Sequence, residues 1–254
     1  MEHAHEKAVA AQFGPRAKAY VESAVHAGGA DLEALKAIVS DARPEQALDV
    51  GAGGGHVSYL MAAHARRVTA CDLSPDMLAA VAATARERRI DNIETVEARA
   101  ERLPFQDGCF DFLACRYSAH HWRDFEAGLR EARRVLERGS RAVFIDACSP
   151  GPAMFDTHLQ AVELLRDTSH VRNYAASEWM AALRRAGFAL ARCQTWRLRM
   201  DFPVWTARMR TPQENVRAIR TLQAAAAGET RAQFAIEDDG SFLLDVLMLE
   251  TAAA

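Results

Sequence analysis

Short apolar runs alternate with longer amphipathic stretches through the middle of this chain. The apolar runs predict buried strands, at residues 47–50, 68–71, 93–98, 110–115 and 142–145. A helix is predicted from about 75 to 89, with Ser74 as its N-cap. Another is predicted from about 125 to 137, ending at Gly139. Strands and helices that alternate in this way form a mainly parallel sheet covered by helices on both faces.

Both ends of the chain depart from this alternation. Before the first strand, helices are predicted at 5–27 and 31–41, although the Gly-Pro pair at 14–15 also allows a mobile arm. Toward the C-terminus the spacing predicts two helices and two long strands, at 153–168, 177–186, 190–200 and 242–249. About 40 residues separate the last two strands and contain a further helix, with Thr211 as N-cap and Pro212 in the first turn. Long ordered connections at the ligand end of a sheet often act as lids or specificity elements.

Composition favours a cytoplasmic protein with a single core. The chain has 254 residues, 50% of them hydrophobic, which is enough to bury one substantial core. Its 31 basic and 34 acidic residues give a net charge of −3, so no overall field attracts nucleic acid or an anionic membrane. The five cysteines are widely spaced without a C-x-x-C pair, and neither a leader-like segment nor a membrane-length apolar run occurs. We therefore expect free thiols and no cysteine-based metal site.

A glycine-rich turn follows the first predicted strand. The sequence LDVGAGGGH spans residues 48–56, and Asp72 follows Gly51 by 21 residues, at the end of the next strand. Glycines at such a turn let the backbone approach a ligand and adopt positive φ angles. A carboxylate at the tip of the neighbouring strand can accept both ribose hydroxyl hydrogens. The pattern therefore predicts a nucleoside-binding site.

The spacing of the glycines separates two nucleoside ligands. The dinucleotide fingerprint G-x-G-x-x-G requires a third glycine where this chain has His56, which disfavours an NAD-dependent dehydrogenase. Instead, Asp49 precedes glycines at every second position, namely Gly51, Gly53 and Gly55. This order resembles the class I S-adenosylmethionine-dependent methyltransferases. Segments resembling landmarks of the small-molecule branch (methyltransferase type 11), including its quinone-biosynthesis members, follow in the family's order at 98–105, 110–113, 118–122 and 131–136.

The resemblance covers roughly residues 45–150 and implies a fold. The family has an α/β three-layer sandwich with a seven-stranded, mainly parallel sheet whose last strand is antiparallel. We expect one such domain over residues 1–254, with helical cap elements at both ends. Residues 1–42 would form a helical N-terminal segment or lid, and 45–150 the cofactor-binding core. Residues 151–254 would supply the substrate-side elements, with a helical insertion at about 203–235.

The same resemblance implies S-adenosylmethionine as the cofactor, S-adenosylhomocysteine as its product, and a set of contact residues. Those residues are Tyr20, Asp49, Gly51, Ala52, Gly53, Asp72, Leu73, Met77, Ala100, Glu101 and Arg116. Asp72 would bind the ribose hydroxyls; its alternative is to cap the following helix. Arg116 would lie near the methionine moiety. Leu73 and Met77 would contact the adenine, and simple core packing explains Met77 equally well.

Two further segments leave alternatives open. The segment around Phe13 and Tyr20 resembles one that folds over the cofactor pocket in quinone-biosynthesis methyltransferases, and ordinary packing of an amphipathic helix explains both aromatic residues equally well. In the adenine-binding loop, the family commonly has an aspartate where this chain has Arg99. Arginine cannot accept a hydrogen bond from the adenine amino group. Ala100 and Glu101 could still contact the ring edge through backbone amides, while Arg99 stacks on adenine or points to water.

The loop after the fourth strand carries the candidate catalytic residues, His120 and His121. An imidazole that titrates near neutrality can accept the acceptor's proton as the methyl group arrives. Alternatively, one histidine of the pair bonds the backbone and fixes the loop. A metal site is not expected, because it needs further ligands and no Asp or Glu lies at i+3 or i+4 from the pair within a plausible helix.

We expect methyl transfer to an O, N or C nucleophile of a small molecule. The segments expected around the pocket are aromatic and arginine-bearing, which favours an apolar or aromatic acceptor, with any acidic group met by an arginine. The fold also serves S-adenosylmethionine-binding enzymes that decarboxylate or rearrange a substrate, and non-catalytic cofactor-binding proteins. No nucleic-acid or membrane partner is expected, and the chain is compatible with a monomer or a homodimer.

Overall fold

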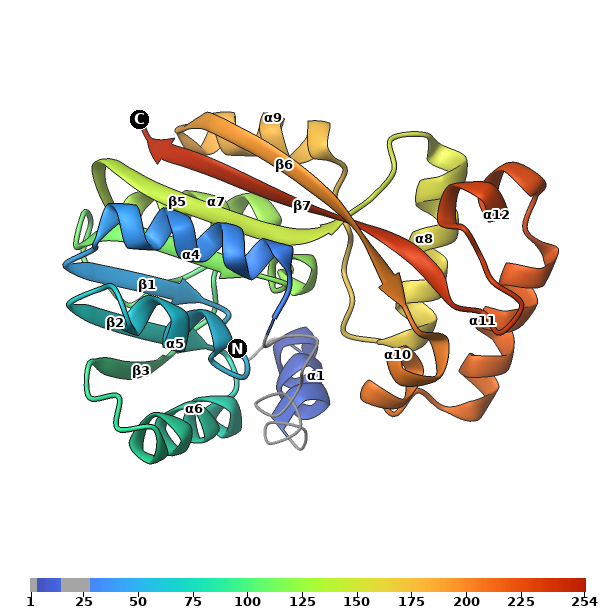
Figure 1. Cartoon of the computed structure of the whole chain (residues 1–254), viewed down its shortest axis with the longest axis horizontal. Coiled ribbons are helices and arrows are strands. Elements are labelled where there is room, and N and C mark those ends of the chain that lie inside the picture. The colour runs from blue at the N-terminus through green and yellow to red at the C-terminus, as the bar shows by residue number, and fades with distance from the viewer. Residues whose placement is uncertain (1–3, 15–27) are drawn as a thin grey trace.

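A seven-stranded sheet forms the centre of the computed structural model, which describes residues 4–14 and 28–254 (Figure 1). The strands are β1 Gln46–Val50, β2 Arg67–Asp72, β3 Ile93–Glu97, β4 Phe110–Arg116, β5 Leu136–Cys148, β6 Phe188–Met200 and β7 Phe242–Ala253. They lie in the order β3-β2-β1-β4-β5-β7-β6. The first five strands pair in parallel, whereas β7 is antiparallel to both β5 and β6. The predicted mainly parallel sheet with an antiparallel last strand is confirmed.

Helices cover both faces of the sheet, as the alternation of strands and helices predicts. One face carries α4 Ala30–Ala42, α5 His56–Ala62 and α6 Pro75–Glu87, and the other carries α7 Phe125–Val135 and α9 Ala176–Ala186. Successive strand residues point to opposite faces. In β4, therefore, Phe112 packs with the first layer and Leu113 with the second. The result is the expected three-layer arrangement.

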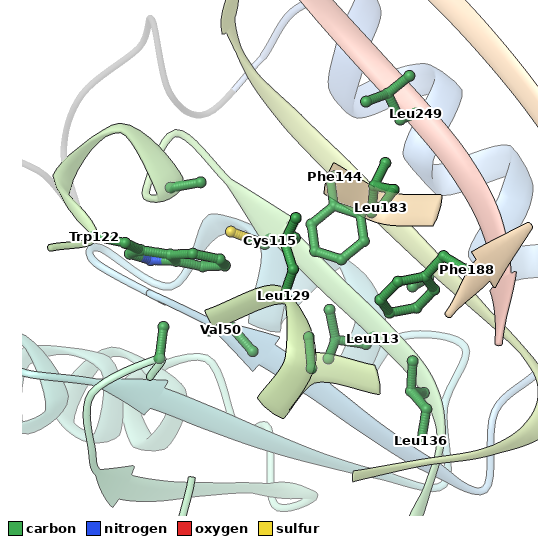
Figure 2. Packing of buried hydrophobic residues seen from close by; sticks show 14 of the residues in the cluster. Val50, Leu113, Cys115, Trp122, Leu129, Leu136, Phe144, Leu183, Phe188 and Leu249 are labelled. Atoms are coloured by element: carbon green, nitrogen blue, oxygen red, sulfur yellow. The ribbon is translucent and has the colours of Figure 1, made fainter. Parts of the chain in front are cut away.

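The larger core lies between the sheet and the layer of α7 and α9. Figure 2 shows Leu113 and Phe144 of the sheet beside Leu129 of α7 and Leu183 of α9, and all four side chains are buried. Burying one such side chain contributes about 1.5–3 kcal/mol relative to leaving it exposed. This packing fixes the carboxyl ends of β4 and β5, from which the site residues extend.

A helical cap packs around the ends of β5, β6 and β7 (Figure 1). Its helices are α8 Ala153–Arg166, α10 Phe202–Arg208, α11 Gln213–Ala225 and α12 Gly228–Phe234. Leu159, Trp205 and Phe242 belong to the apolar cluster that joins this cap to the sheet. Because α10 to α12 all lie between β6 and β7, helices connect these two strands where a tight hairpin would suffice.

The N-terminal helix α1 spans Ala4–Phe13 and contributes side chains to the cofactor cavity described below. The helix predicted over 5–27 continues into residues 15–27, which lie outside the described residues, as does Tyr20. Within 4–14 and 28–254, no helix combines the length and apolar character needed to cross a membrane.

The predicted end of the helix that begins near residue 125 is wrong. α7 ends at Val135, because Leu136 is buried and already pairs with Phe110 of β4. Gly139, with a φ of 85°, lies inside β5 instead of ending the helix. The strand predicted over 142–145 therefore begins six residues earlier, at Leu136.

The predicted N-cap of the inserted helix is also wrong. α11 begins at Gln213, so Pro212 precedes it and no side chain caps it. The Thr211 hydroxyl donates instead to the carbonyl oxygen of Arg166, at 3.0 Å. This bond attaches the insertion to the end of α8.

Candidate active site

The candidate site lies where β1 and β4 run side by side. The strand order reverses there, and ligands of open parallel sheets bind beyond the carboxyl ends of the strands at such a point. A cavity of about 1110 Å³, its open mouth included, occupies this place and is called the first cavity below. The loops after β1, β2, β3 and β4 form its walls, together with residues of α1.

The structure brings ten of the eleven predicted cofactor residues to the wall of the first cavity. They are Asp49, Gly51, Ala52, Gly53, Asp72, Leu73, Met77, Ala100, Glu101 and Arg116. The eleventh, Tyr20, lies outside the described residues. Residues separated by up to 67 positions in the sequence thus share one wall, because four parallel strands end at the same edge of the sheet.

The glycine turn exposes backbone to the first cavity. Gly51, Gly53 and Gly55 have φ angles of 74°, 50° and 80°, in the region where glycine alone is unstrained. A Cβ atom on Gly51 would lie 1.9 Å from the Ser118 hydroxyl oxygen, so a larger residue would clash. At Gly53 no atom of the other described residues, its chain neighbours aside, lies within 4 Å of the Cβ position, which leaves the backbone open to them on that side.

Asp72 joins the glycine turn to the following helix. Its Oδ2 accepts the Gly53 N–H and its Oδ1 accepts the Ser74 N–H, both at 2.8 Å. Burial raises the pKa of Asp72, and these backbone hydrogen bonds oppose the rise. The N-cap of α6 is Ser74, whose hydroxyl accepts from the Met77 N–H. Asp72 therefore does not cap the helix itself, and each of its oxygens retains lone pairs for a ligand.

Asp49 presents an unpartnered oxygen in the wall of the first cavity. Its Oδ2 accepts the Ser58 hydroxyl at 2.6 Å, whereas its buried Oδ1 has no hydrogen-bond partner among the described residues. Burial raises the pKa of Asp49 to about 7. A buried carboxylate in this state favours a ligand that brings positive charge. S-adenosylmethionine carries an ammonium and a sulfonium, so the side chains of this cavity fit the expected cofactor.

Arg116 is held by a residue that the sequence pattern did not single out. Its Nε donates to Oδ2 of Asp31 in α4 at 2.6 Å, and both side chains are buried. The guanidinium also lies over the Tyr117 ring, 4.6 Å from its centroid. Arg116 lines the first cavity as expected, in an orientation that α4 helps to fix.

Arg99 lines the first cavity and has a partner that neither alternative included. Its Nη1 lies 2.5 Å from Oε1 of Glu6 in α1, so it forms an ion pair with the N-terminal helix. Glu101 is similarly committed, because its Oε1 accepts the backbone N–H of Arg123 at 2.9 Å. The carboxylate of Glu101 thus holds the start of the next loop, and its backbone remains at the cavity wall.

A second cavity of about 710 Å³, its open mouth included, adjoins the first. The two share Phe13, Tyr117 and His121. The rings of Phe13 and His121 meet edge to face with their centroids 5.0 Å apart. The helical cap, the ends of β5, β6 and β7 and the loops after β4 and α8 supply the remaining walls, which include Trp205 and Met200. A molecule in the second cavity would therefore lie next to one in the first.

His120 lines the second cavity and forms a dyad with Asp146 at the end of β5. The Nδ1–H of His120 donates to Asp146 Oδ1 at 2.6 Å, and the His120 backbone N–H donates to Oδ2 at 3.2 Å. Burial would lower the pKa of His120, but the carboxylates of Asp146, Glu163 and Asp167 together outweigh burial, so the pKa is raised. The dyad leaves Nε2 as the atom that can accept a proton.

His121 is in a different environment from its neighbour. Its Nδ1–H donates to the Ser169 carbonyl oxygen at 3.0 Å, and its own carbonyl accepts from His5 Nε2 at 3.0 Å. Burial and the charge of His120 lower the pKa of His121 to about 4. His121 therefore stays neutral and fixes the loop, which is the alternative expected for one member of the pair. The described residues contain no cluster of histidine, cysteine and carboxylate side chains suited to a metal ion.

The comparisons with known proteins agree with this geometry. A family described as a methyltransferase domain matches residues 48–144. The chain is 44% identical over 200 residues to the uncharacterized protein YafE of Escherichia coli, covering 79% of this chain and 97% of that one. It is 31% identical over 224 residues to the uncharacterized methyltransferase YcgJ of Bacillus subtilis, covering 88% of each chain. The crystal structure of YcgJ matches with a TM-score of 0.84 and 29% identity, over 87% of this chain and 97% of that one.

A shorter similarity concerns a protein with a named acceptor. The chain is 34% identical over 113 residues to the demethylmenaquinone methyltransferase of Chlorobaculum tepidum, covering 44% of this chain and 45% of that one. The YafE and YcgJ similarities extend well beyond residues 48–144, whereas this one spans less than half of either chain.

Proposed function

Because this chain belongs to the class I S-adenosylmethionine-dependent methyltransferases, we propose that it methylates a small, neutral acceptor with an apolar or aromatic body. The adjoining cavities carry the proposal, since they share Phe13, Tyr117 and His121. The first cavity would hold the cofactor and the second the acceptor. His120, on the wall of the second, would receive the acceptor's proton.

The first cavity offers a partner for each part of the cofactor. The free lone pairs of Asp72 suit the two ribose hydroxyls. The unpartnered Oδ1 of Asp49 suits a cationic group of the methionine moiety. Leu73 and Met77 supply apolar surface for the adenine ring, and the backbone of Gly51 to Gly53 lies close to the methionine chain.

S-adenosylmethionine would supply an electrophilic methyl group bound to its sulfonium sulfur. The leaving group would be the neutral thioether S-adenosylhomocysteine. The acceptor's nucleophilic atom forms the new bond to the methyl carbon while the carbon–sulfur bond breaks. The protein's task is to hold the two in line and exclude water, which can account for roughly 7–11 kcal/mol of the barrier. The edge-to-face pair of Phe13 and His121 lines both cavities, where it would restrict the acceptor's approach to the methyl group.

His120 is the proposed general base because its environment suits proton transfer. Asp146 holds the Nδ1–H, so Nε2 would take the acceptor's proton, and the carboxylate stabilises the imidazolium that results. His121 lacks such a carboxylate contact at short range, since Asp167 Oδ2 lies 4.0 Å from its Nε2. We therefore assign His121 to positioning.

The charges of the second cavity favour a neutral acceptor. Arg166 pairs with Glu163 at 3.4 Å and lies over the Trp205 ring, 4.8 Å from its centroid. His120 is matched by Asp146 in the same way, and the wall's other two charged residues, Arg208 and Asp167, have opposite signs. The similarity to a demethylmenaquinone methyltransferase supports an acceptor with a flat apolar body.

Calorimetry with S-adenosylmethionine, S-adenosylhomocysteine and NAD in parallel tests the cofactor assignment. We expect micromolar binding of the two sulfur nucleosides and none of NAD. An assay for S-adenosylhomocysteine release would then compare 1-naphthol, 1,4-dihydroxynaphthalene and the cationic hexylamine. Comparable turnover of hexylamine would refute the neutral acceptor. Conversion of an acceptor without S-adenosylhomocysteine release would show that the cofactor is retained for different chemistry.

A further inference from the structure

The side-chain amide of Asn173 is buried without a partner. Four buried side-chain polar atoms lack a hydrogen bond within the described part of the chain, and two of them are the Nδ2 and Oδ1 of Asn173. The residue is 1% exposed and lines the second cavity. Buried amides are nearly always hydrogen-bonded, so an unpaired one needs an explanation.

The surrounding residues hold the Asn173 backbone and leave its side chain unmatched. Gln160 of α8 accepts the Asn173 N–H at 3.0 Å and donates to the Asn173 carbonyl oxygen at 2.7 Å. Gln160 also accepts from His170 Nε2 at 2.9 Å and donates to Asp156 Oδ1 at 2.8 Å. Each polar atom of the Gln160 amide is therefore used twice, and position 173 is fixed by its backbone alone.

The other polar groups around Asn173 in the second cavity have partners. Glu163 bonds Arg166, and Oδ1 of Asp167 accepts both the N–H and the hydroxyl of Ser169, at 2.9 and 2.6 Å. The apolar part of the wall includes Trp205 and Leu244. Apart from the Nε2 of His120, which is assigned to proton transfer, the Asn173 amide is thus the group of this wall best able to recognise a polar ligand.

We propose that Asn173 determines acceptor specificity, by binding a neutral molecule that carries a hydrogen-bond donor beside an acceptor atom. A primary amide offers an N–H donor and a carbonyl acceptor side by side, so its complement carries both. A hydroxyl next to a carbonyl or carboxamide on an aromatic ring has this chemistry. An analogue without the pair leaves the amide unsatisfied and binds more weakly. The inference rests on the proposed function, because it takes the second cavity as the acceptor site.

Calorimetry on protein saturated with S-adenosylhomocysteine tests this, with three related probes. 1-Hydroxy-2-naphthamide carries the neutral pair, 1-naphthol lacks the carboxamide, and 1-hydroxy-2-naphthoate carries a charge. We expect the naphthamide to bind at least tenfold more tightly than either other probe. In Asn173→Leu, which has a similar volume, this preference should disappear while the affinity for 1-naphthol is unchanged. Asn173→Ala provides the same comparison if the leucine variant does not fold.

Thermal unfolding separates recognition from a structural role. Removing an unpaired buried amide should leave the melting temperature of Asn173→Leu unchanged or higher. A lower melting temperature, equal binding of naphthamide and naphthol to the unaltered protein, or a preference that survives in both variants would each overturn the inference. Failure of the unaltered protein to bind S-adenosylhomocysteine would instead refute the proposed function.

Discussion

Asp72 serves both the fold and the proposed ribose contact. Asp72→Ala should remove two charge-assisted hydrogen bonds to the ribose, each worth roughly 1.5–3 kcal/mol, and weaken S-adenosylhomocysteine binding by roughly a hundred to ten thousand times. Calorimetry measures this, and circular dichroism should show that the fold persists. Asp91→Ala alters an exposed carboxylate outside the first cavity and is the control. Unchanged affinity in Asp72→Ala would remove the ribose assignment.

His120 and Asp146 should set the pH dependence of turnover. A base works in its neutral form, so kcat should fall as the pH drops through the raised pKa of His120. Asp146→Asn removes the nearest of the carboxylates that raise this pKa, whereas burial, which lowers the pKa, is unchanged. The acidic limb of the kcat profile should therefore move to lower pH. His120→Gln should remove the limb and reduce kcat by roughly 100-fold or more.

A half-buried histidine elsewhere provides the control for this profile. His158 lies on α8, and burial lowers its pKa. His158→Gln should leave the acidic limb where it is. A limb that stays in place in Asp146→Asn, or that persists in His120→Gln, would assign it to another group.

The sequence identifies those residues of this site whose neighbours in space are also near them in the chain. Asp72 and the glycines belong to one strand–turn–helix–strand unit, so spacing alone identifies them. Asp146 bonds His120 across 26 positions in the sequence. It directly follows the apolar run at 142–145, however, and this position was a usable signal. No sequence pattern around Asn173 points to a function. Its proposed role follows from the hydrogen bonds that its neighbours make with one another.

At the scale of elements, α1 is attached to the core at three points. Glu6 pairs with Arg99, His5 donates to the His121 carbonyl, and Phe13 packs against the His121 ring. Each residue also lines the first cavity, so α1 partly covers the proposed cofactor. The departure of Arg99 from the family's usual aspartate thus gives the N-terminal helix an ion pair.

The Glu6–Arg99 pair should therefore slow cofactor release. Its side chains are 18% and 29% exposed, so the interaction is partly screened and worth about 1 kcal/mol. Glu6→Gln should raise the dissociation rate of S-adenosylhomocysteine by roughly fivefold in stopped-flow measurements. In a double-mutant cycle, adding Arg99→Gln should cause little further change. Fully additive effects of the two substitutions would show that the pair is not coupled to release.

Strand positions were more predictable than the ends of elements. Apolar positions locate all seven strands, although only the five inner strands are largely buried and the edge strands β3 and β6 are mostly exposed or half-buried. Ends depend on partners: Leu136 extends β5 because Phe110 pairs with it, and Thr211 bonds Arg166 instead of capping α11. These contacts join segments that are distant in the sequence, so local spacing gives no information about them.

At the scale of the whole molecule, a buried carboxylate in the wall of the cofactor cavity lowers the stability of the fold. Asp49 is buried in the central strand β1, and its pKa is raised from 3.8 to about 7. Between these values the unfolded chain releases this proton and the folded protein retains it. The contribution of Asp49 to the free energy of unfolding should therefore be most favourable below about pH 4. It should decrease as the pH rises to about 7, by roughly 4 kcal/mol at most. A single domain, a monomer or homodimer, and a cytoplasmic location remain predictions.

Asp49→Asn should consequently separate stability from cofactor binding. At pH 8 the variant should melt several degrees above the unaltered protein, and near pH 4 the difference should shrink. The retained amide oxygen can still accept the Ser58 hydroxyl, so local packing is kept. The same change should weaken S-adenosylmethionine binding and abolish the rise in affinity that the unaltered protein should show from pH 6 to pH 8 as Asp49 ionises.

The two readouts belong together, because one charge causes both. An ionised, buried Asp49 whose Oδ1 has no hydrogen-bond partner among the described residues opposes folding, and a cationic cofactor removes that opposition by binding beside it. S-adenosylmethionine should therefore stabilise the unaltered protein more at pH 8 than at pH 5, and stabilise Asp49→Asn equally at both. Asp91→Asn, at an exposed position, should behave as the unaltered protein does. If Asp49→Asn lowers the melting temperature at pH 8, the carboxylate is stabilised within the protein and its assignment to the cofactor's cationic group fails.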